Sequence, residues 1–378
     1  MKCKWYESHH CQSCALLNDT YQASLVKKEN DLRSLFKGLE LNLQEIVDCE
    51  PVEASRGKAK LAVSGNENTI EFGFYDSQLN FKTLEECPLH MVGINELLVD
   101  LKTRLKKYNI IPYNLHTKKG ELKYLIISKS LENQEILVRF VVRSKESLDR
   151  LKKLAQEWIM TSLEVKVVSL NIQPEHKAIL EGEEEIILTP AASINCQMGD
   201  VHLSLGARSF FQVTPSVSLR LYQSVRQVLS DNNIHSFLDL YCGVGAFSFF
   251  AAQTCQRVLG VEISKEAIEA AKLAVAKNKI LKSIEFQSLD VDKFLLTQTE
   301  TFDAILVNPP RRGLNESIIS RLLELRPKMI IYSSCQALTL SRDVKMLEAH
   351  YSINKTQIFD MFPFTDHYET LMILVRKE

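Results

Sequence analysis

The chain has 378 residues, of which 45% are hydrophobic and 25% charged, a composition typical of a globular protein rather than a disordered or fibrous one. At roughly 100 to 200 residues per domain, this length predicts two or three domains. Lys and Arg total 46 against 47 Asp and Glu, so the formal net charge of −1 excludes a uniformly basic nucleic-acid binder. No apolar run reaches the roughly 18 residues that span a bilayer, and the N-terminus has no signal-peptide pattern, so we expect a cytoplasmic protein.

The first ninety residues are predicted to contain one helix, at 22–39, and two strands, at 58–63 and 70–75. They also hold four of the cysteines that stand out by position: Cys3, Cys11, Cys14 and Cys87. In a reducing compartment, cysteines are expected to be ligands, nucleophiles or core residues rather than disulfides. Residues 1–90 are therefore predicted to form a small N-terminal region closed by its thiols. Four thiolates suit zinc or an iron–sulfur cluster equally well.

The next region, 91–185, contains a strongly basic stretch. Between 102 and 153 there are fourteen Lys or Arg against five Asp or Glu, a local net charge of +9. Two β-rich segments lie inside it, at 122–128 and 136–143. The candidate phosphate-contacting cations are Lys118, Lys119, Lys123, Arg139 and Arg143, with Tyr113 and Tyr124 between them. A solvated charged face is the alternative, and the acidic run at 181–185 is predicted to be the hinge to the next domain.

The last region, 186–378, alternates short apolar segments with longer amphipathic ones. Strands are predicted at 236–240, 257–261, 283–287, 304–307 and 329–332, and helices at 218–229, 264–278, 316–325 and 337–349. Such alternation predicts an α/β domain with a mostly parallel, doubly wound sheet.

A glycine-rich turn follows the first of these strands. Asp239 stands in the strand, Gly243 and Gly245 lie in the turn, and Glu262 ends the next strand. Glycines in a strand-to-helix turn let a ligand approach the backbone, and an acid at the next strand end accepts hydrogen bonds from a ribose diol. The third glycine of the dinucleotide fingerprint is missing. The pattern resembles the class I S-adenosylmethionine methyltransferase fold, and a tight turn with a capping acid is the alternative.

Two more motifs follow strands of the same domain. The segment Asn308-Pro309-Pro310-Arg311 ends the fourth predicted strand, and Ser334-Cys335 ends the fifth. Both should lie at the carboxyl edge of the sheet, where doubly wound folds bind ligands. A partly exposed cysteine near arginines can lose its proton and act as a nucleophile. Cys335 is therefore predicted to be catalytic rather than structural.

A thiolate beside a methyl donor has a definite use in uracil chemistry. Carbon 5 of uracil is too weak a nucleophile to attack a sulfonium methyl, but thiolate addition at carbon 6 turns it into an enolate carbon that can. After methyl transfer, a general base must remove the proton on carbon 5 so that the thiolate can leave. Glu369, near the C-terminus, is the candidate base.

Taken together and in this order, the motifs resemble those of the RNA uracil-C5 methyltransferases, and the resemblance covers essentially the whole chain. The matching segments are the Asp-x-x-Cys-Gly-x-Gly turn, Ser209-Phe210-Phe211-Gln212, Asn308-Pro309-Pro310-Arg311, Ser334-Cys335, Met361-Phe362-Pro363 and His367-Tyr368-Glu369. The resemblance implies that the donor is bound by Gln212, Tyr241, Gly243, Glu262 and Asn308. It also implies Cys335 as the nucleophile and Glu369 as the base.

The N-terminal cysteines are similar to those of the family branch that methylates a loop uridine of 23S ribosomal RNA. This likeness implies that Cys3, Cys11, Cys14 and Cys87 are ligands of a [4Fe-4S] cluster. The tRNA-modifying branch usually lacks such a cluster. Two positions depart from the family pattern: Gln336 follows the nucleophile where many members have Asn, and Phe364 stands where histidine is common.

The expected reaction is S-adenosylmethionine-dependent formation of 5-methyluridine in 23S ribosomal RNA. The same reaction on another ribosomal or transfer RNA uridine is an alternative, as is a metal-stabilised RNA-binding protein without catalysis. An amino-group methyltransferase is disfavoured, because such enzymes normally place an aromatic residue after the two prolines and need no cysteine. We expect RNA as the partner, with no DNA, membrane or obligate protein partner.

Overall fold

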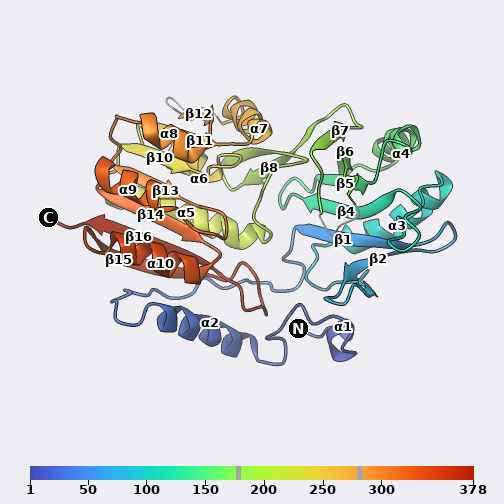
Figure 1. The fold of residues 1–378 in the computed structure, drawn as a ribbon, viewed down its shortest axis with the longest axis horizontal. Helices are drawn as coiled ribbons and strands as arrows, with labels where there is room; N and C mark the ends of the chain where they lie inside the picture. The colour runs from blue at the N-terminus through green and yellow to red at the C-terminus, as the bar shows by residue number, and fades with distance from the viewer. Residues whose placement is uncertain (176–179, 279–283) are drawn as a thin grey trace. The chain divides into compact units, whose positions relative to one another are not determined.

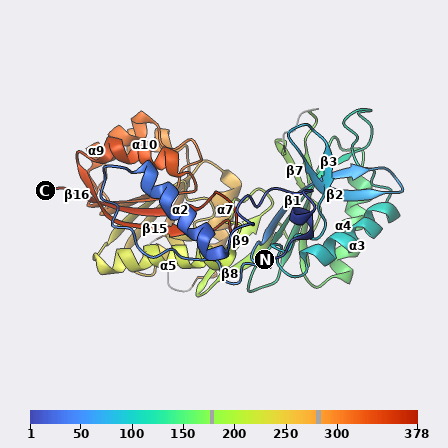
Figure 2. The ribbon, with the colours of Figure 1, turned by 90° about the horizontal axis from the view of Figure 1, so that it is seen from below.

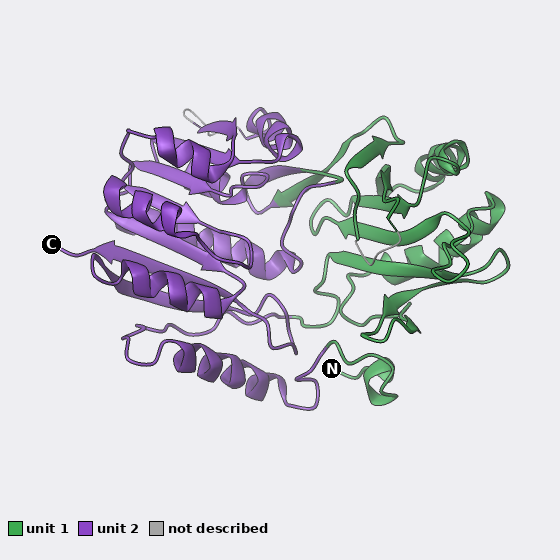
Figure 3. Cartoon of the chain, viewed as in Figure 1, with its two compact units in different colours: residues 1–13, 51–197, 205–207 green, residues 14–50, 198–204, 208–378 purple. Residues whose placement is uncertain are grey.

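A computed structural model describes residues 1–175, 180–278 and 284–378. These fall into two compact units (Figure 3). Unit 1 comprises 1–13, 51–197 and 205–207, and unit 2 comprises 14–50, 198–204 and 208–378. The units do not follow the three consecutive regions predicted from the sequence, because 14–50 belongs to the same unit as the C-terminal half.

Unit 1 is built on a seven-stranded sheet in the order β3-β2-β1-β4-β5-β6-β7. Its strands are β1 (Lys58–Gly65), β2 (Ile70–Tyr75), β3 (Phe81–Thr83), β4 (Leu122–Lys129), β5 (Ile136–Val142), β6 (Val165–Ile172) and β7 (Glu184–Ile187). The pairs are antiparallel except β5 with β6, which are parallel. The predicted strands at 58–63, 70–75, 122–128 and 136–143 are confirmed as β1, β2, β4 and β5. Its helices are α1 (Lys4–Glu7), α3 (Ile94–Lys107) and α4 (Leu148–Thr161).

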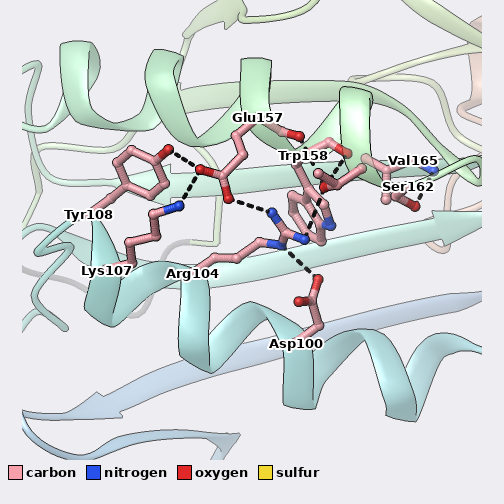
Figure 4. Close-up of polar contacts among 9 residues, drawn as sticks. Asp100, Arg104, Lys107, Tyr108, Glu157, Trp158, Ser162 and Val165 are labelled. Carbon is pink, nitrogen blue, oxygen red and sulfur yellow. Dashed lines mark hydrogen bonds and ion pairs between the residues drawn. The ribbon is translucent and has the colours of Figure 1, made fainter.

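Helices α3 and α4 lie side by side and are joined through one carboxylate (Figure 4). Glu157 on α4 accepts hydrogen bonds from Arg104 at 3.2 Å, from Tyr108 at 2.6 Å and from Lys107. The Arg104 guanidinium also lies over the Trp158 ring, 5.5 Å from its centroid. The apolar faces of both helices join the sheet in one core, so several basic residues of the 102–153 stretch serve the fold.

Two of the predicted phosphate-contacting cations are buried in unit 1. Arg139 is 2% exposed and pairs with Glu181 at 2.6 Å and with Glu185. Lys123 is 6% exposed and donates to the main-chain oxygen of Gln173 at 2.8 Å. The prediction that these two side chains contact phosphates is wrong, because their donors are used inside the protein. The acids at 181 and 185, predicted to be a hinge, are instead partners of Arg139.

The other candidates of that stretch differ in exposure. Arg143 pairs with the buried Glu121 at 2.6 Å, and Tyr113 is 3% exposed. Lys118 and Lys119 are exposed in the loop before β4. Among the cations singled out from the sequence, these two lysines are the exposed ones, whereas Arg143 is 33% exposed and paired with Glu121.

Unit 2 is built on a second seven-stranded sheet, in the order β12-β11-β10-β13-β14-β16-β15. Its strands are β10 (Ser236–Leu240), β11 (Arg257–Glu262), β12 (Ile284–Ser288), β13 (Ala304–Val307), β14 (Met329–Ser334), β15 (Tyr351–Phe359) and β16 (Glu369–Arg376). The first five are parallel, which confirms the predicted doubly wound sheet. The predicted start of β12 at 283 lies outside the described residues. A separate two-stranded sheet pairs β8 (Ser193–Met198) with β9 (Val201–Gly206).

Helices cover both faces of this sheet, with α5 on the opposite side from α9 and α10 (Figures 1 and 2). The helices are α2 (Tyr21–Leu35), α5 (Pro215–Asp231), α6 (Ala246–Ala251), α7 (Lys265–Val275), α8 (Val291–Thr297), α9 (Glu316–Leu325) and α10 (Ala337–Leu347). Four of these helices, α2, α7, α8 and α9, begin at a side-chain cap: Thr20, Ser264, Asp290 and Asn315 each accept a first-turn backbone N–H. The five helices predicted from the sequence are confirmed.

The antiparallel end of the sheet was not predicted from the sequence. β16 pairs antiparallel with β14, and β15 pairs antiparallel with β16. Helix α2 packs Leu32 into the same core as α9 and α10. The chain segment after α2 then runs beside β15, through bridges at Leu43 and Val47. Among the described residues, no helix is long and apolar enough to cross a membrane.

Candidate active site

The glycine-rich turn after β10 has the backbone conformation that its residues require. Tyr241, Gly243 and Gly245 have φ angles of 63°, 55° and 81°. A Cβ on Gly245 would come within 2.6 Å of the Phe286 ring, so a larger residue would clash there. A Cβ on Gly243 would meet nothing within 4 Å. The backbone at Gly243 therefore faces open space at the carboxyl edge of the sheet, as expected for a turn that a ligand approaches.

Two carboxylates flank this turn. Glu262 accepts a hydrogen bond from the Gly243 N–H at 3.2 Å and another from the Ser264 N–H at 3.0 Å. Asp239 is fully buried, and its Oδ2 accepts from the Ser248 hydroxyl at 2.6 Å. Its Oδ1 has no hydrogen-bond partner among the residues that the structure describes. Burial raises the pKa of Asp239 to about 7, with a smaller contribution from Glu262.

The remaining donor-binding candidates lie in loops of the same unit. Asn308 directly follows β13, and its N–H donates to the Leu240 carbonyl at 3.4 Å. Gln212 is 7% exposed and stands just before α5. Thr214, at the start of α5, donates its hydroxyl to the Met361 carbonyl at 2.8 Å. The open Gly243 backbone and the unpaired Asp239 oxygen fit a polar small molecule bound at this edge.

Cys335 and Glu369 are brought together by the pairing of β14 with β16. Ser334 is paired with Thr370, so Cys335, the next residue, stands across from Glu369, the residue before Thr370. Side chains of directly opposed residues point to the same face of a sheet. The two residues are 34 positions apart in the sequence, and the antiparallel register makes them neighbours.

Glu369 is buried and hydrogen-bonded to a neighbouring hydroxyl. Its side chain is 1% exposed, and Oε1 accepts a hydrogen bond from the Ser333 hydroxyl at 2.5 Å. Burial raises the pKa of Glu369 from 4.5 to about 7, and the Ser333 hydrogen bond offsets part of this shift. A carboxyl that changes charge near neutral pH is suited to general acid–base chemistry. No sequence motif marks Ser333, although it is two residues before Cys335 and therefore on the same side of the strand.

Cys335 is partly exposed, unlike the buried Cys49, Cys196, Cys242 and Cys255. The pKa of its thiol is raised overall, first by burial and then by the Glu369 charge, while the Arg311 guanidinium offsets part of this through a hydrogen bond and its charge. Arg311 is therefore the group that favours the thiolate.

Helix α10 holds the loop that carries Arg311. Asp343 is fully buried and accepts from the Leu314 N–H and the Tyr332 hydroxyl, both at 2.7 Å. Arg342 donates to the main-chain oxygens of Arg312 and Leu314, both at 3.0 Å. The sequence offered no signal for Asp343, which reads as an ordinary helix residue.

The N-terminal cysteines Cys3, Cys11, Cys14 and Cys87 are all partly exposed. Burial raises the pKa of the Cys87 thiol, and the nearby Cys3 and Cys11 thiols raise it further. These three sulfurs of unit 1 thus lie within electrostatic reach of one another. Within 1–175, 180–278 and 284–378, however, no group of three or more His, Cys, Asp and Glu side chains has an arrangement that could hold a metal ion. The predicted cluster stays a prediction.

The fold and the residues at the carboxyl edge of its sheet are those of a class I S-adenosylmethionine-dependent methyltransferase. The family model described as tRNA (Uracil-5-)-methyltransferase matches residues 20–377. The chain therefore belongs to the uracil-C5 methyltransferase family, as the sequence motifs indicated.

Curated relatives match the chain over its whole length. It is 37% identical to the 23S rRNA (uracil(747)-C(5))-methyltransferase RlmC of Xenorhabdus nematophila, over 99% of this chain and 100% of that protein. It is 36% identical to the protein of the same name from Proteus mirabilis, over 100% of both chains. Among solved structures, it is similar to the Pyrococcus abyssi tRNA (uracil-54, C5)-methyltransferase in complex with S-adenosyl-L-homocysteine. That match has a TM-score of 0.79 and 25% identity, and covers 96% of this chain and 86% of that one.

Proposed function

We propose that the protein transfers a methyl group from S-adenosylmethionine to carbon 5 of a uridine in 23S ribosomal RNA, forming 5-methyluridine. The observation that carries this proposal is the placement of a partly exposed thiol, Cys335, across from a buried carboxyl, Glu369. An amino-group methyltransferase has no use for this pair. The full-length likeness to proteins named for 23S rRNA supports ribosomal rather than transfer RNA as the substrate.

In the proposed reaction, the Cys335 thiolate adds to carbon 6 of the uracil, and the electron pair of the 5,6 double bond moves to make carbon 5 nucleophilic. Carbon 5 then takes the methyl group from the sulfonium donor, which leaves as the neutral thioether. The Glu369 carboxylate removes the proton on carbon 5, the 5,6 double bond re-forms, and the bond from carbon 6 to sulfur breaks. Cys335 is released as the thiolate, and the methylated RNA leaves.

The donor is proposed to bind at the carboxyl edge of the unit 2 sheet. Gly243 lets it approach the backbone, and Glu262 has carboxylate lone pairs free for a ribose diol beyond its two backbone hydrogen bonds. Tyr241, Gln212 and Asn308 are proposed to line the same site. Residues 186–378 would then form the catalytic region, and 91–185 an RNA-binding region in which Lys118 and Lys119 meet the phosphates. Ribosomal RNA as substrate implies a cytoplasmic reaction.

A methyl-transfer assay with labelled S-adenosylmethionine tests the proposal. The substrates are 23S ribosomal RNA and transfer RNA from a strain that lacks the gene, followed by mass-spectrometric mapping of 5-methyluridine. Label in one 23S uridine is the expected result. Label in transfer RNA alone would support the other substrate, and RNA binding without transfer would support the non-catalytic alternative.

We further propose that Cys3, Cys11, Cys14 and Cys87 are the ligands of a [4Fe-4S] cluster. The electrostatic proximity of the Cys3, Cys11 and Cys87 sulfurs supports this, and the thiolate set also suits zinc. Protein purified without oxygen should contain iron and sulfide and absorb broadly in the visible range. Stoichiometric zinc without iron would contradict the cluster, and variants with Ser at Cys3 and Cys87 should lose the bound metal.

A further inference from the structure

The loop between β15 and β16 leads directly into Glu369. It spans 360–368, and its own hydrogen bonds are local ones, such as the Thr365 hydroxyl to the Phe362 carbonyl at 2.8 Å. Short local bonds of this kind shape a turn but do not fix where the loop lies. The contacts that the loop makes with the rest of unit 2 therefore decide the direction from which the chain enters β16.

Two side chains of α2 hold the start of the loop, together with the Val47 carbonyl, which accepts from the Asp360 N–H at 2.8 Å, and the Thr214 hydroxyl, which donates to the Met361 carbonyl. Asp360 is fully buried, and its carboxylate accepts from the Tyr21 hydroxyl at 2.6 Å and from the Lys28 ammonium at 2.5 Å. Lys28 also donates to the Phe362 carbonyl at 2.9 Å. The Tyr21 hydroxyl in turn accepts from the Cys49 N–H at 2.7 Å. One ammonium thus fixes both a side chain and a main-chain oxygen of the loop.

The middle and the end of the loop contact α2 and the residues just before it. Phe364 is buried with φ at 59°, and its ring centroid is 5.4 Å from that of Tyr21. The Leu16 N–H donates to the Phe364 carbonyl at 2.9 Å. Tyr368, the residue before Glu369, donates its hydroxyl to Asp31 of α2 at 2.6 Å. Phe364, the departure from the family pattern, therefore packs against α2.

If α2 only had to pack against the core, apolar side chains would stabilise that packing at least as well as a buried charged pair. The Lys28 and Asp360 side chains are 1% and 0% exposed, and burying two charges costs about as much as their attraction returns. Leu25 and Leu32 lie on the same buried face of α2, so an apolar residue at position 28 would continue an apolar stripe. The Lys28 ammonium instead fixes the path of the loop, because it donates hydrogen bonds both to Asp360 and to the Phe362 carbonyl.

We infer that Lys28, with Tyr21 and Asp31 on the same helix, is a positioning residue for Glu369, holding the 360–368 loop so that the carboxyl is aimed at the proton on carbon 5. The inference rests on the proposed function. Arg311, which hydrogen-bonds Cys335, lies in a loop that α10 holds instead: the Thr339 hydroxyl donates to the Arg311 carbonyl at 3.2 Å, and Asp343 accepts from the Leu314 N–H. Loosening the α2 contacts should thus impair the elimination step while leaving thiolate addition and methyl transfer largely intact.

The test is a single-turnover reaction with methyl-labelled donor, in which methyl transfer and release of the RNA from Cys335 are timed separately. With Lys28→Met, transfer should stay close to the wild-type rate. Release should slow by about 10- to 100-fold, the cost of a small misplacement of a catalytic group, and labelled RNA should accumulate on the protein as a denaturation-resistant band. Ser341→Ala is the matched control. It removes a different α2 contact, the Ser341 hydroxyl to the Leu35 carbonyl at 2.8 Å, and should leave release unchanged.

A double variant separates positioning from stability. Lys28→Met with Asp360→Leu replaces the pair by apolar side chains, which should restore the melting temperature lost in the single variant. If release remains slow in the restored protein, the positioning role is supported. If release recovers together with the melting temperature, the pair only stabilises the fold and the inference is overturned.

Tyr21→Phe provides a milder probe, since it removes a single hydroxyl and should slow release without slowing transfer. Normal release by both Tyr21→Phe and Lys28→Met would also overturn the inference. A wild-type protein that makes no 5-methyluridine would instead refute the proposed function. The two failures are thus distinguishable.

Discussion

The Ser333 hydroxyl donates a 2.5 Å hydrogen bond to Oε1 of Glu369, a carboxyl that is 1% exposed. The bond lowers the pKa of the Glu369 carboxyl and burial raises it, and the net pKa is about 7. Ser333 therefore affects how much of Glu369 is ionised at neutral pH, and ionisation is what a base for proton removal requires.

Ser333→Ala should raise the pKa of Glu369 further and move the pH profile of RNA release to higher pH. On the acid side of the profile, a pKa higher by one leaves about tenfold less of the carboxyl ionised, so release at neutral pH should fall by up to that factor. The measurement is the release rate from about pH 6 to about pH 9, which brackets the titration of Glu369. Recovery of the rate at high pH would distinguish this effect from misfolding, and a profile identical to that of the wild type would contradict it.

Cys335→Ala and Glu369→Gln should stop the reaction at different stages. Without the thiol no covalent adduct can form, so no methyl group should transfer. Without the carboxylate, addition and transfer can proceed but elimination stalls, so methylated RNA should remain attached to Cys335. A denaturing gel with methyl-labelled donor reads both outcomes. Free methylated RNA from the Cys335 variant would exclude the covalent mechanism, and normal turnover by the Glu369 variant would exclude that residue as the base.

Glu369→Gln should also make the protein more stable at pH 8. The folded-state pKa is raised from 4.5 to about 7, so the folded protein holds this proton more tightly than the unfolded chain. The contribution of this group to stability is present below pH 4.5 and is lost as the pH rises to about 7, at a cost of about 3 kcal/mol. Gln has no charge to desolvate and can still accept from Ser333. Urea unfolding should show a higher free energy of unfolding for the variant at pH 8 and a much smaller difference at pH 4.

Arg139→Gln should lower the stability of the protein, whereas the double variant Lys118→Ser with Lys119→Ser should leave stability nearly unchanged. Removing the Arg139 guanidinium leaves Glu181 and Glu185 without their partner, which should cost about 3 kcal/mol of unfolding free energy. The exposed lysines make little contribution to stability.

RNA-binding measurements test the same distinction between the buried Arg139 and the exposed Lys118 and Lys119. Loss of Lys118 and Lys119 should weaken RNA binding and flatten its dependence on salt, since each phosphate contact adds about 0.7 to 0.9 to the slope. Folded Arg139→Gln protein, at a temperature where it is fully native, should bind RNA with the wild-type slope. A reduced salt dependence of RNA binding for Arg139→Gln alone would show that Arg139 contacts an RNA phosphate.

The local sequence by itself determined much of unit 2. Apolar residues at strand and helix spacing located β10 to β14 and the helices α7 and α9 between them, because these periods depend only on neighbouring residues. Parallel strands joined by helices place their carboxyl ends at one edge, so the glycine turn, Asn308 and Cys335 were predicted together. The family motifs added Glu369, which reads in isolation as a surface glutamate.

Tertiary structure decided which charged groups are buried and with what partners. Lys28 and Asp360 are 332 residues apart, and Arg139 and Glu185 are 46 apart; no local pattern pairs them. The strand register sets Glu369 across from Cys335, and the packing of 14–50 against the C-terminal sheet places α2 beside the loop that leads into Glu369. Hydrophobic periodicity reports which face of an element is buried, but the pairing of distant groups depends on how the whole chain packs, and that information exists only in the folded structure.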